Sequence, residues 1–585
     1  MLLESDLLHH EEGGYALRGP LPPLAIPTTL QDSLMARLDR QSSARDTAQL
    51  ASAIGREFSH ELIRAVSPLD ETTLRQALGQ LVEAELIYRR GSPSNTVYLF
   101  KHALILDAAY QSLLKSRRQI YHQKIAIALE ERFPAARDTQ PALLAHHYTE
   151  AGMTELALDY WQKAGQFAIE RTANIEAIAS LTKGLDLIER LPAGIGRVQR
   201  ELALRVAIGI PLVATRGYAA ADVERTYTRA HALALEVGES PQLPNILWGL
   251  WVFYLTGGPL DTALEIAGQY RELAERRQES ALLLETSQMN GIPHFYMGNF
   301  ALGRPYLERG AAMYDPKLHH ALIFEHGGAD TGVAVMTHEA LAVWALGYPD
   351  QARQKMQAAM ACARSLEHPF TLAFGLYFSA WLFKLLGEDA AVRESTAEAV
   401  KICDEYGFPF WGLSSAGLRG STLLEHGNAE DGIAAMRSAL TTDEASGAEL
   451  CRPALLCLLA TSLARTGRPD QGLEVLTQAF AAMEKSQERW WHAEALRLRG
   501  ELLLMLPGDH ATEAQAAFEE ALAVAVRQQA PSWELRAAAS LFRHRRKHAS
   551  EATARELLVK VCSGFSEGFE TADLREALAL LDLDG

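Results

Sequence analysis

Apolar segments with helical periodicity along this chain end at glycines that recur at a nearly constant interval. Most steps between these glycines are 40 residues long, with one step of 49 and one of 41. A self-similar period of this size is typical of proteins built from repeated helical units. The series consists of Gly258, Gly298, Gly347, Gly387, Gly427, Gly467 and Gly508, and the earlier Gly152 stands in the same local setting.

Small residues follow these glycines in phase. The first lies five positions after the glycine and the second lies seven positions further on, which is two turns along one face of a helix. Small side chains there allow the second helix of a pair to lie close to the first, so the pattern predicts a helical hairpin in each repeat. The glycine is expected at the end of the first helix, where a positive φ is needed. The first set is Ala157, Ala263, Gly303, Ala352, Gly432 and Gly472, with Val392 departing and Ala514 one place late; the second is Ala164, Gly310, Ala359, Ala399, Ala439, Ala479 and Ala521, with Tyr270 as the exception.

One such hairpin cannot bury its apolar face alone, whereas a stack of hairpins shares a continuous core. The sequence therefore predicts a mainly α fold in which residues 131–585 form a right-handed α-solenoid. The succession of a small, a bulky and a small residue in Ala157, Trp161 and Ala164 resembles the tetratricopeptide repeat, with a period longer than its usual length of about 34 residues. Further helical segments continue the stack or cap its end, at residues 175–190, 197–213, 221–237, 246–255, 532–543, 550–562 and 571–581.

The first 130 residues have a different pattern. Three short helical patterns, at 46–54, 59–66 and 71–85, precede two β-prone runs, at 86–90 and 97–100, which flank the turn-rich sequence GSPSNT. Three helices followed by a hairpin predict a winged-helix domain at residues 44–130. Residues 21–40 read as a proline-rich lead into one amphipathic helix and are predicted to be a connector within a separate segment, 1–43.

Composition places the chain among ordinary globular proteins. It has 585 residues, of which 48% are hydrophobic and 22% charged, and a formal net charge of −17. The five cysteines form no CxxC pair, the start of the chain is acidic, and no apolar run reaches the roughly 20 residues that a membrane helix needs. A cytoplasmic location without a membrane span is therefore predicted.

Motifs for nucleotide or acyl chemistry are incomplete. A phosphate-binding loop of the form GxxxxGK[ST] requires a Gly-Lys pair, which occurs nowhere in this sequence. The glycine cluster at 327–332 (GGADTG) lacks the lysine and is better explained as a turn between helices. The sequence GFSEG at 564–568 matches GxSxG formally, but no histidine follows it, so a loop between terminal helices is favoured over a hydrolase elbow.

Two clusters of polar residues leave alternatives open. His319, His320, His326, Asp330 and His338 are able to ligate metal, yet they lack the paired spacing of zinc sites. Roles as solvated loop residues and helix caps are therefore favoured over a metal-dependent enzyme in the solenoid groove. The basic run at 543–548 is able to contact phosphate or acidic lipid, although a solvated turn between helices is favoured.

Tryptophans and charge bear on possible partners. Residues at 248, 251, 344, 381 and 411 are tryptophans that either line a peptide-binding groove or belong to the core. A winged helix also suggests DNA binding, but the segment 70–85, the candidate recognition helix, carries four acidic residues against Arg75 alone, and Arg89 and Arg90 in the wing do not compensate. Nucleic acid is therefore not expected as a partner, and a DNA-binding transcriptional regulator stays the alternative.

Six segments together resemble the C-terminal half of bacterial predicted ATPases of the STAND class. These regulators often carry an adenylate/guanylate cyclase domain, then an AAA-like ATPase, a winged helix and tetratricopeptide repeats. The segments are IPTTLQDSLMARLDR (26–40), IGREFSHEL (54–62), FKHALILDAAYQSLLKSRRQIYH (100–122), LLAHHYTEAG (143–152), RGYAAADVERTY (216–227) and WALGYPDQA (344–352).

The resemblance implies a regulatory module without catalytic residues of its own. In such proteins the cyclase and ATPase core would precede Met1, so residues 1–43 correspond to the end of an ATPase module, and no catalytic, cofactor-binding or metal-binding residue is carried over. We therefore expect a non-enzymatic scaffold that binds protein or peptide partners through its solenoid, including an ATPase or cyclase domain on another chain. The sequence does not indicate which solenoid residues bind the partner.

Overall fold

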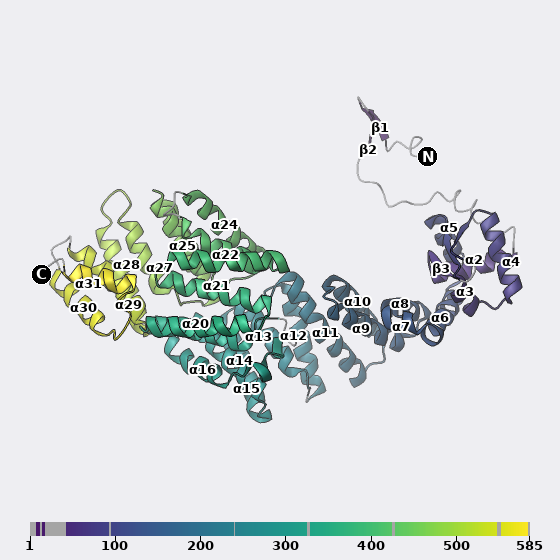
Figure 1. Ribbon diagram of the computed structural model, residues 1–585, viewed down its shortest axis with the longest axis horizontal. Coiled ribbons are helices and arrows are strands. Elements are labelled where there is room, and N and C mark those ends of the chain that lie inside the picture. The colour runs from purple at the N-terminus through teal and green to yellow at the C-terminus, as the bar shows by residue number, and fades with distance from the viewer. Residues whose placement is uncertain are drawn as a thin grey trace. The chain divides into compact units, whose positions relative to one another are not determined.

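The computed structural model describes residues 8–11, 14–17, 42–92, 95–238, 240–323, 328–423, 428–546 and 551–582 (Figure 1). The chain divides into two compact units, Met1–Ala193 and Gly194–Gly585. The predicted connector at 21–40, and with it most of the predicted segment 1–43, lies outside the described residues. The predicted domain boundaries at 43 and 130 stay predictions.

The first unit contains three short helices packed with a three-stranded antiparallel sheet. The sheet has the order β3-β5-β4, in which Phe58 pairs with Tyr98 and Ile87 pairs with Phe100. The side chains of Ser59 and Asp70 accept hydrogen bonds from backbone N–H groups at the starts of the second and third helices, which fixes where these helices begin. The elements are α2 (Ser42–Ile54), β3 (Glu57–Ser59), α3 (His60–Val66), α4 (Glu71–Glu83), β4 (Ile87–Arg90) and β5 (Val97–Phe100).

These elements match the predicted helices and hairpin, and the winged-helix assignment itself stays a prediction. Strand β3 was not predicted, because three residues that run directly into a helix give no strand pattern of their own. A separate antiparallel pair, β1 (Leu8–Glu11) and β2 (Gly14–Leu17), was also missed.

Helices follow to the end of the first unit. Helix α6 packs against α8, α8 against α9, and α9 against α10, so neighbouring helices in the chain are also neighbours in space. Gly152 ends α8 with a φ of 77°, the left-handed conformation that glycine adopts without strain. These helices are α5 (Ala103–Gln111), α6 (Lys115–Arg132), α7 (Pro134–Thr139), α8 (Pro141–Ala151), α9 (Thr154–Glu170), α10 (Asn174–Leu187) and the short 3₁₀ turn Ile188–Arg190.

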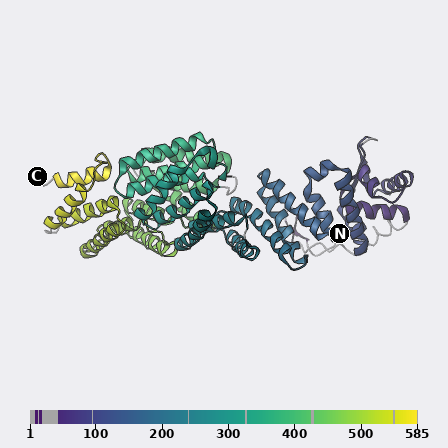
Figure 2. The same cartoon turned by 90° about the horizontal axis from the view of Figure 1, so that it is seen from below.

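The second unit is a stack of antiparallel helical hairpins, seen side-on in teal, green and yellow in Figure 2. The predicted mainly α fold of tetratricopeptide-like hairpins is confirmed. The helices are α11 (Ile195–Arg216), α12 (Ala221–Val237), α13 (Leu243–Gly257), α14 (Leu260–Arg277), α15 (Ser280–Tyr296), α16 (Phe300–Met313), α17 (Pro316–His319), α19 (Thr331–Ala345), α20 (Pro349–Ser365), α21 (Pro369–Leu385), α22 (Asp389–Tyr406), α23 (Pro409–Gly420), α24 (Ala429–Ser446), α25 (Arg452–Arg465), α26 (Pro469–Ser486), α27 (His492–Leu503), α28 (Ala511–Arg527), α29 (Pro531–Arg546), α30 (Glu551–Ser563) and α31 (Ala572–Asp582).

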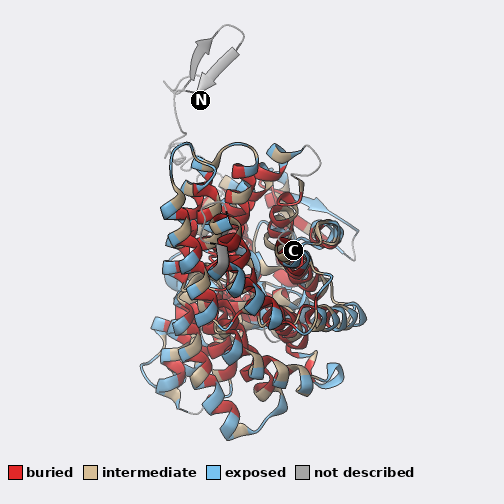
Figure 3. Ribbon diagram, turned by 90° about the vertical axis from the view of Figure 1, so that its left-hand side faces the viewer, coloured by how far each residue is buried: buried red, intermediate tan, exposed pale blue. Residues whose placement is uncertain are grey.

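The glycine series lies at the ends of the first helices of these hairpins. Five of its members have the predicted positive φ, Gly258 does not, with a φ of −109°, and Gly427 lies outside the described residues. The small residues after each glycine face the partner helix: a Cβ on Gly472 would lie 2.9 Å from the carbonyl oxygen of Ala460 in the preceding helix. The buried faces of the helices turn toward one another inside the stack (Figure 3).

Hairpins about 190 residues apart in the chain also contact each other in the second unit, in a regular series. The carbonyl of Thr256, at the end of α13, accepts hydrogen bonds from the backbone N–H groups of Glu449 and Leu450, at 2.8 and 3.1 Å, just before α25. The carbonyl of Tyr296, at the end of α15, does the same with the residues just before α27. The last carbonyls of a helix have no partner within it, so these contacts satisfy them and join one turn of the solenoid to the next.

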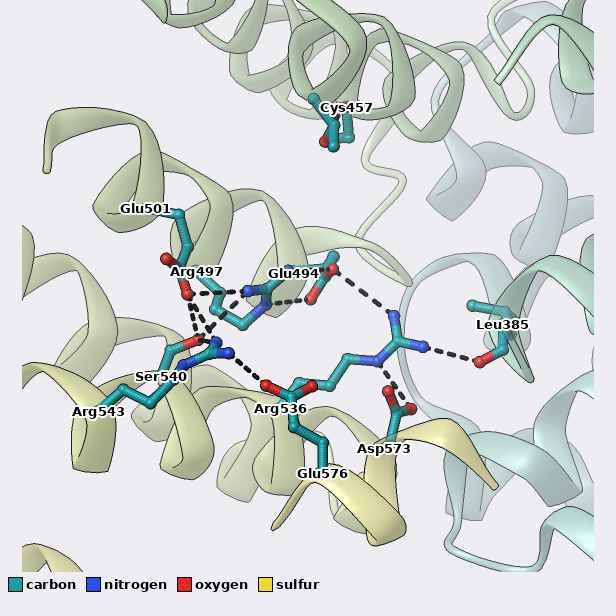
Figure 4. A network of polar contacts seen from close by, with 11 residues as sticks. Leu385, Cys457, Glu494, Arg497, Glu501, Arg536, Ser540, Arg543, Asp573 and Glu576 are labelled. Carbon is teal, nitrogen blue, oxygen red and sulfur yellow. Dashed lines mark hydrogen bonds and ion pairs between the residues drawn. The ribbon is translucent and has the colours of Figure 1, made fainter. Parts of the chain in front are cut away.

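A polar network lies at the C-terminal end of the second unit (Figure 4). Arg536 of α29 donates a 2.7 Å hydrogen bond to the carbonyl of Leu385, at the end of α21, and pairs with Asp573 of α31 at 2.9 Å and with Glu494 of α27 at 3.5 Å. Arg497 pairs with the same Glu494 at 2.8 Å. Burial opposes ionisation of Glu494, but the two guanidinium groups hold its pKa below the usual value. This buried cluster therefore joins four helices of the second unit.

Three motif interpretations can be compared with the structure. The basic run at 543–548 was expected to be a solvated turn between helices. Its first four residues, Arg543–Arg546, instead form the last turn of helix α29, where Arg543 pairs with Glu501 at 3.0 Å. Residues 547 and 548 lie outside the described part. The segment 564–568 is a loop between α30 and α31, as predicted, and Glu567 in it accepts hydrogen bonds from the N-terminus of α20. No helix among the described residues is long and apolar enough to cross a membrane.

Candidate functional site

An aromatic cavity lies inside the second unit, with a volume of about 90 Å³. Its wall comes from the first helices of five hairpins, α13, α15, α19, α21 and α23, and from residues between α11 and α12 and just before α19 and α25. A water molecule needs roughly 10–15 Å³ of such space, so the cavity has room for several waters or for one ring-sized group. Its aromatic lining residues are Tyr218, Trp248, Trp251, Tyr296, Phe370, Phe374, Tyr377, Phe378, Phe410 and Trp411.

The rings differ in exposure along the cavity. Trp251 and Tyr296, at 1% and 0% exposed, form its deep end, whereas Phe374 and Trp411 are half-buried. Trp411 packs edge-on against Phe374, with ring centroids 5.3 Å apart, and against Tyr377 at 5.5 Å. Edge-to-face contacts at these distances fix ring orientation. The cavity is therefore a preformed apolar slot with an aromatic mouth.

A few polar groups lie in this apolar wall. Nδ1 of His338 is 2.7 Å from the carbonyl of Ala334, so Nδ1 carries the proton, and Nε2 accepts a hydrogen bond from the hydroxyl of Tyr296 at 3.1 Å. Burial lowers the pKa of His338 to about 4 and raises that of Tyr296 well above its ordinary value. Both groups are therefore neutral at pH 7.

Gln288 is the polar lining residue with an unsatisfied atom. Its side chain is 8% exposed, and its Oε1 atom is buried without a hydrogen-bond partner among the described residues. An unpaired buried acceptor costs about 1–3 kcal/mol. Gln288 lines the cavity, but this Oε1 atom is buried within the wall, so the surface of the cavity is mainly apolar.

A buried carboxyl group lies behind the cavity wall. Glu488 accepts hydrogen bonds from the indole Nε1 of Trp490 at 2.5 Å and from the backbone N–H of Cys451 at 3.0 Å. Cys451 lines the cavity. Burial raises the pKa of Glu488 from 4.5 to about 8, although both hydrogen bonds favour the carboxylate.

The five candidate metal ligands are not gathered into one site among the described residues. Ser280 and the backbone N–H of Asp315 contact the two ring nitrogens of His319, at 2.6 and 3.0 Å. Asp330 caps helix α19 and contacts His320 at 3.0 Å. His338 lies in the aromatic cavity instead, and residue 326 lies outside the described part. Asp330 has the capping role that the sequence favoured, whereas the prediction of solvated loop residues is wrong for His319 and His338, which are buried at 2% exposure.

The tryptophans divide between the two roles that the sequence left open. Trp248, Trp251 and Trp411 line the cavity. Trp344 packs against Trp533, with centroids 4.8 Å apart, and Trp381 packs against Trp490 at 5.5 Å, so these two belong to the core. The cavity itself was not predicted, because its lining comes from residues 218 to 451.

The candidate recognition helix in the first unit has little positive charge to offer. Arg75 of α4 pairs with Glu71 at 2.6 Å, one turn away. Arg89 and Arg90 are exposed on β4. Two exposed arginines beside an acidic helix provide few phosphate contacts, on which DNA affinity largely depends.

No family model matches the chain. An uncharacterized protein of Rhizobium meliloti (strain 1021) is 26% identical over 482 residues, which are 81% of this chain and 46% of that relative. The chain thus spans about half the length of this curated relative.

Solved structures with similar helical arrays share little sequence with the chain. A STAND protein with a tetratricopeptide repeat sensor from Pyrococcus horikoshii is 8% identical, covering 87% of this chain and 66% of that chain, with a TM-score of 0.33. Human IFIT1 with m7Gppp-AAAA is 13% identical, covering 72% and 90%, with a TM-score of 0.39. Yeast Tom70 is 12% identical, covering 79% and 96%, with a TM-score of 0.31. At these scores the similarity carries no information on ligand, partner or activity.

Proposed function

We propose that the second unit is a non-catalytic binding module that takes an apolar or aromatic side chain of a protein or peptide partner into the aromatic cavity. The observation that carries the proposal is the cavity itself, which has half-buried rings at its mouth and the hydrogen-bonded pair Tyr296 and His338 in its wall. Sites of this kind, mostly apolar with a few placed polar groups, are typical of ligand pockets. Aromatic and other large apolar anchors also supply much of the affinity of protein interfaces.

The chemistry of the wall favours binding over catalysis. His338 and Tyr296 are neutral and hydrogen-bonded to each other, and Cys451 Sγ lies 3.7 Å from the same hydroxyl. An activated nucleophile or general base requires a shifted pKa that favours the reactive form near pH 7. Burial shifts the pKa values of His338 and Tyr296 away from that range.

We also propose, from the sequence resemblance, that the chain regulates a nucleotide-switching domain of the STAND type. In this proposal residues 44–130 are a winged helix that transmits the state of the solenoid, at residues 131–585, to an ATPase or cyclase domain. The acidic character of α4 supports a protein partner over DNA for this helix. The signal would then be occupancy of the aromatic cavity.

The binding proposal is tested with a random peptide library selected on the immobilised full chain. We expect selected peptides to share an aromatic or branched apolar residue, and to lose at least ten-fold in affinity for Ala334→Phe, because a phenyl ring at this lining position fills the cavity. Ala358→Phe, an exposed position on α20, is the matched control and should bind normally. Circular dichroism confirms that both variants are folded. Unchanged affinity of Ala334→Phe, or no enrichment on the wild-type chain, would refute the proposal.

A further inference from the structure

Three imidazole rings meet between two helices of the first unit. His122 comes from α6, and His146 and His147 come from α8. One ring nitrogen of each lies within 4.8 Å of the others. Within the described residues, this is the one group of three or more histidine, cysteine or acidic side chains close enough to hold a metal ion. The aromatic cavity belongs to the other unit, so the proposed peptide binding does not use these rings.

The two buried rings, His122 and His147, direct their Nδ1 atoms toward each other. Nδ1 of His122 and Nδ1 of His147 are 2.9 Å apart. Two such nitrogens at this distance require either a shared proton or a shared cation between their lone pairs. For metal–nitrogen bonds of about 2.05 Å, ligand nitrogens are roughly 2.9 Å apart at a right angle and roughly 3.3 Å apart at a tetrahedral angle. The observed distance lies at the lower of these values.

His122 already has the outer contacts of a metal ligand. Its other nitrogen, Nε2, is 2.9 Å from the hydroxyl of Tyr110, and this hydroxyl is 3.4 Å from the carboxylate of Glu150. Ligating histidines usually direct their second nitrogen to a carboxylate, a carbonyl or a bridging group, which orients the ring. With Nδ1 as the ligand atom, Nε2–H donates to Tyr110 and Tyr110 donates to Glu150.

His147 has an atom that the protein leaves unsatisfied. The residue is 1% exposed, and its Nε2 has no hydrogen-bond partner among the described residues. His319, a structural histidine in the second unit, is comparably buried, and both of its ring nitrogens have partners. Ligation through Nδ1 would leave this Nε2 atom without a partner, so the case for a metal depends on the Nδ1–Nδ1 contact and on the three convergent rings.

The third ring provides access. His146 is exposed, so an ion reaches the site from solvent. Three nitrogen ligands with one open side are a common zinc arrangement.

We propose that His122, His146 and His147 bind one divalent transition-metal ion of the zinc type. The ion joins α6 to α8 and replaces the proton between the two Nδ1 atoms. Imidazole nitrogen selects zinc, cobalt, nickel or copper over magnesium and calcium, which prefer oxygen ligands. The site stabilises the packing of these two helices in the first unit.

The test uses the full chain stripped with a chelator and titrated with Zn²⁺ by calorimetry and with Co²⁺ by visible absorption. We expect saturable binding of one ion per chain, and at least a ten-fold loss of affinity in His146→Ala, which removes an exposed ligand without opening the core. His231→Ala, a histidine of α12 in the second unit, is the matched control and should bind as the wild type does. Zn²⁺ should raise the unfolding midpoint of the first unit in the wild type and in His231→Ala only.

Two results would overturn the proposal. One is the absence of saturable Zn²⁺ and Co²⁺ binding to the folded wild-type chain. The other is binding that His146→Ala leaves unchanged. Since peptide selection reports on the second unit, its failure and the failure of metal binding are independent.

Discussion

Helices of the repeat approach each other closely at its small residues, so enlarging one of them, Gly472, should destabilise the second unit by a calculable amount. A Cβ at this position would lie 2.6 Å from Cδ2 of Leu502 and 2.9 Å from the carbonyl oxygen of Ala460. Ordinary contact begins at 3.4 Å, so in Gly472→Ala helix α25 must separate from α26 by 3.4 − 2.9 = 0.5 Å, while the Leu502 side chain rotates away. A gap of about 0.5 Å forfeits roughly a quarter of each dispersion contact across the pair.

The free energy of the substitution follows from two opposing effects. Overpacking of this kind costs about 1–3 kcal/mol, and replacing a helical glycine by alanine returns about 0.5–1 kcal/mol. The difference spans about 0–2.5 kcal/mol, so Gly472→Ala should destabilise the second unit by about 1 kcal/mol. Gly268→Ala is the matched control, because it lies in the middle of α14 with nothing within 4 Å of the new Cβ, and it should stabilise by about 0.5–1 kcal/mol.

Urea unfolding followed by tryptophan fluorescence measures both effects. Eight of the nine tryptophans lie in residues 194–585 and only Trp161 lies in the first unit, so the signal reports mainly on the second. The two variants should move the midpoint in opposite directions. If Gly472→Ala stabilises the unit as much as Gly268→Ala does, the small residues of the repeat are not there to allow close packing.

Three further predictions concern buried polar groups. Because the pKa of Glu488 is raised to about 8, the folded state holds a proton that the unfolded state releases above pH 4.5. The stability that this proton contributes is fully present below pH 4.5 and is lost as the pH rises through 8, by about 2 kcal/mol between pH 6 and 8. The urea midpoint of Glu488→Gln should therefore depend less on pH than that of the wild type. Arg536→Leu leaves Glu494 with one cation and should cost about 3 kcal/mol in denaturant unfolding, whereas Arg364→Leu, whose partner Glu398 is exposed, should cost about 0–1 kcal/mol. Ser532→Ala removes the 2.6 Å hydrogen bond to the carbonyl of Trp344 and should lower the same stability by about 1 kcal/mol.

The repeat was predictable because its signals are local. A glycine at a helix end and a small residue five positions later act within one hairpin, so their spacing in the sequence is also their spacing in the structure. Proline adds to this, since Pro349, Pro369 and Pro469 each stand in the first turn of a helix, where the missing N–H costs nothing. The sequence analysis did not use these prolines, but the boundaries that it did predict, such as 221–237 for α12 and 532–543 for α29, lie within a few residues of the helix ends.

The sites were less predictable because each depends on packing between distant segments. The quoted segments 100–122 and 143–152 contain all three histidines of the proposed metal site, but only the packing of α6 on α8 places His122 beside His147. The cavity joins Trp248 to Cys451, which become neighbours only when the second turn of the solenoid docks on the first. No sequence pattern distinguishes Trp411, at the cavity mouth, from Trp381, in the core.

The contacts between solenoid turns also link the cavity to the stability of the fold. Leu450 and Cys451 line the cavity, and their backbone N–H groups bond to the carbonyl of Thr256 and to Glu488. The cavity is therefore complete only while the second turn is docked. A ligand that binds the complete cavity must stabilise the docked state by mass action. Hydrogen exchange at the amides of Leu450 and Cys451 should consequently slow when a selected peptide saturates the wild-type chain, and should not change in Ala334→Phe. Exchange that stays constant at saturation would show that the peptide binds away from these contacts.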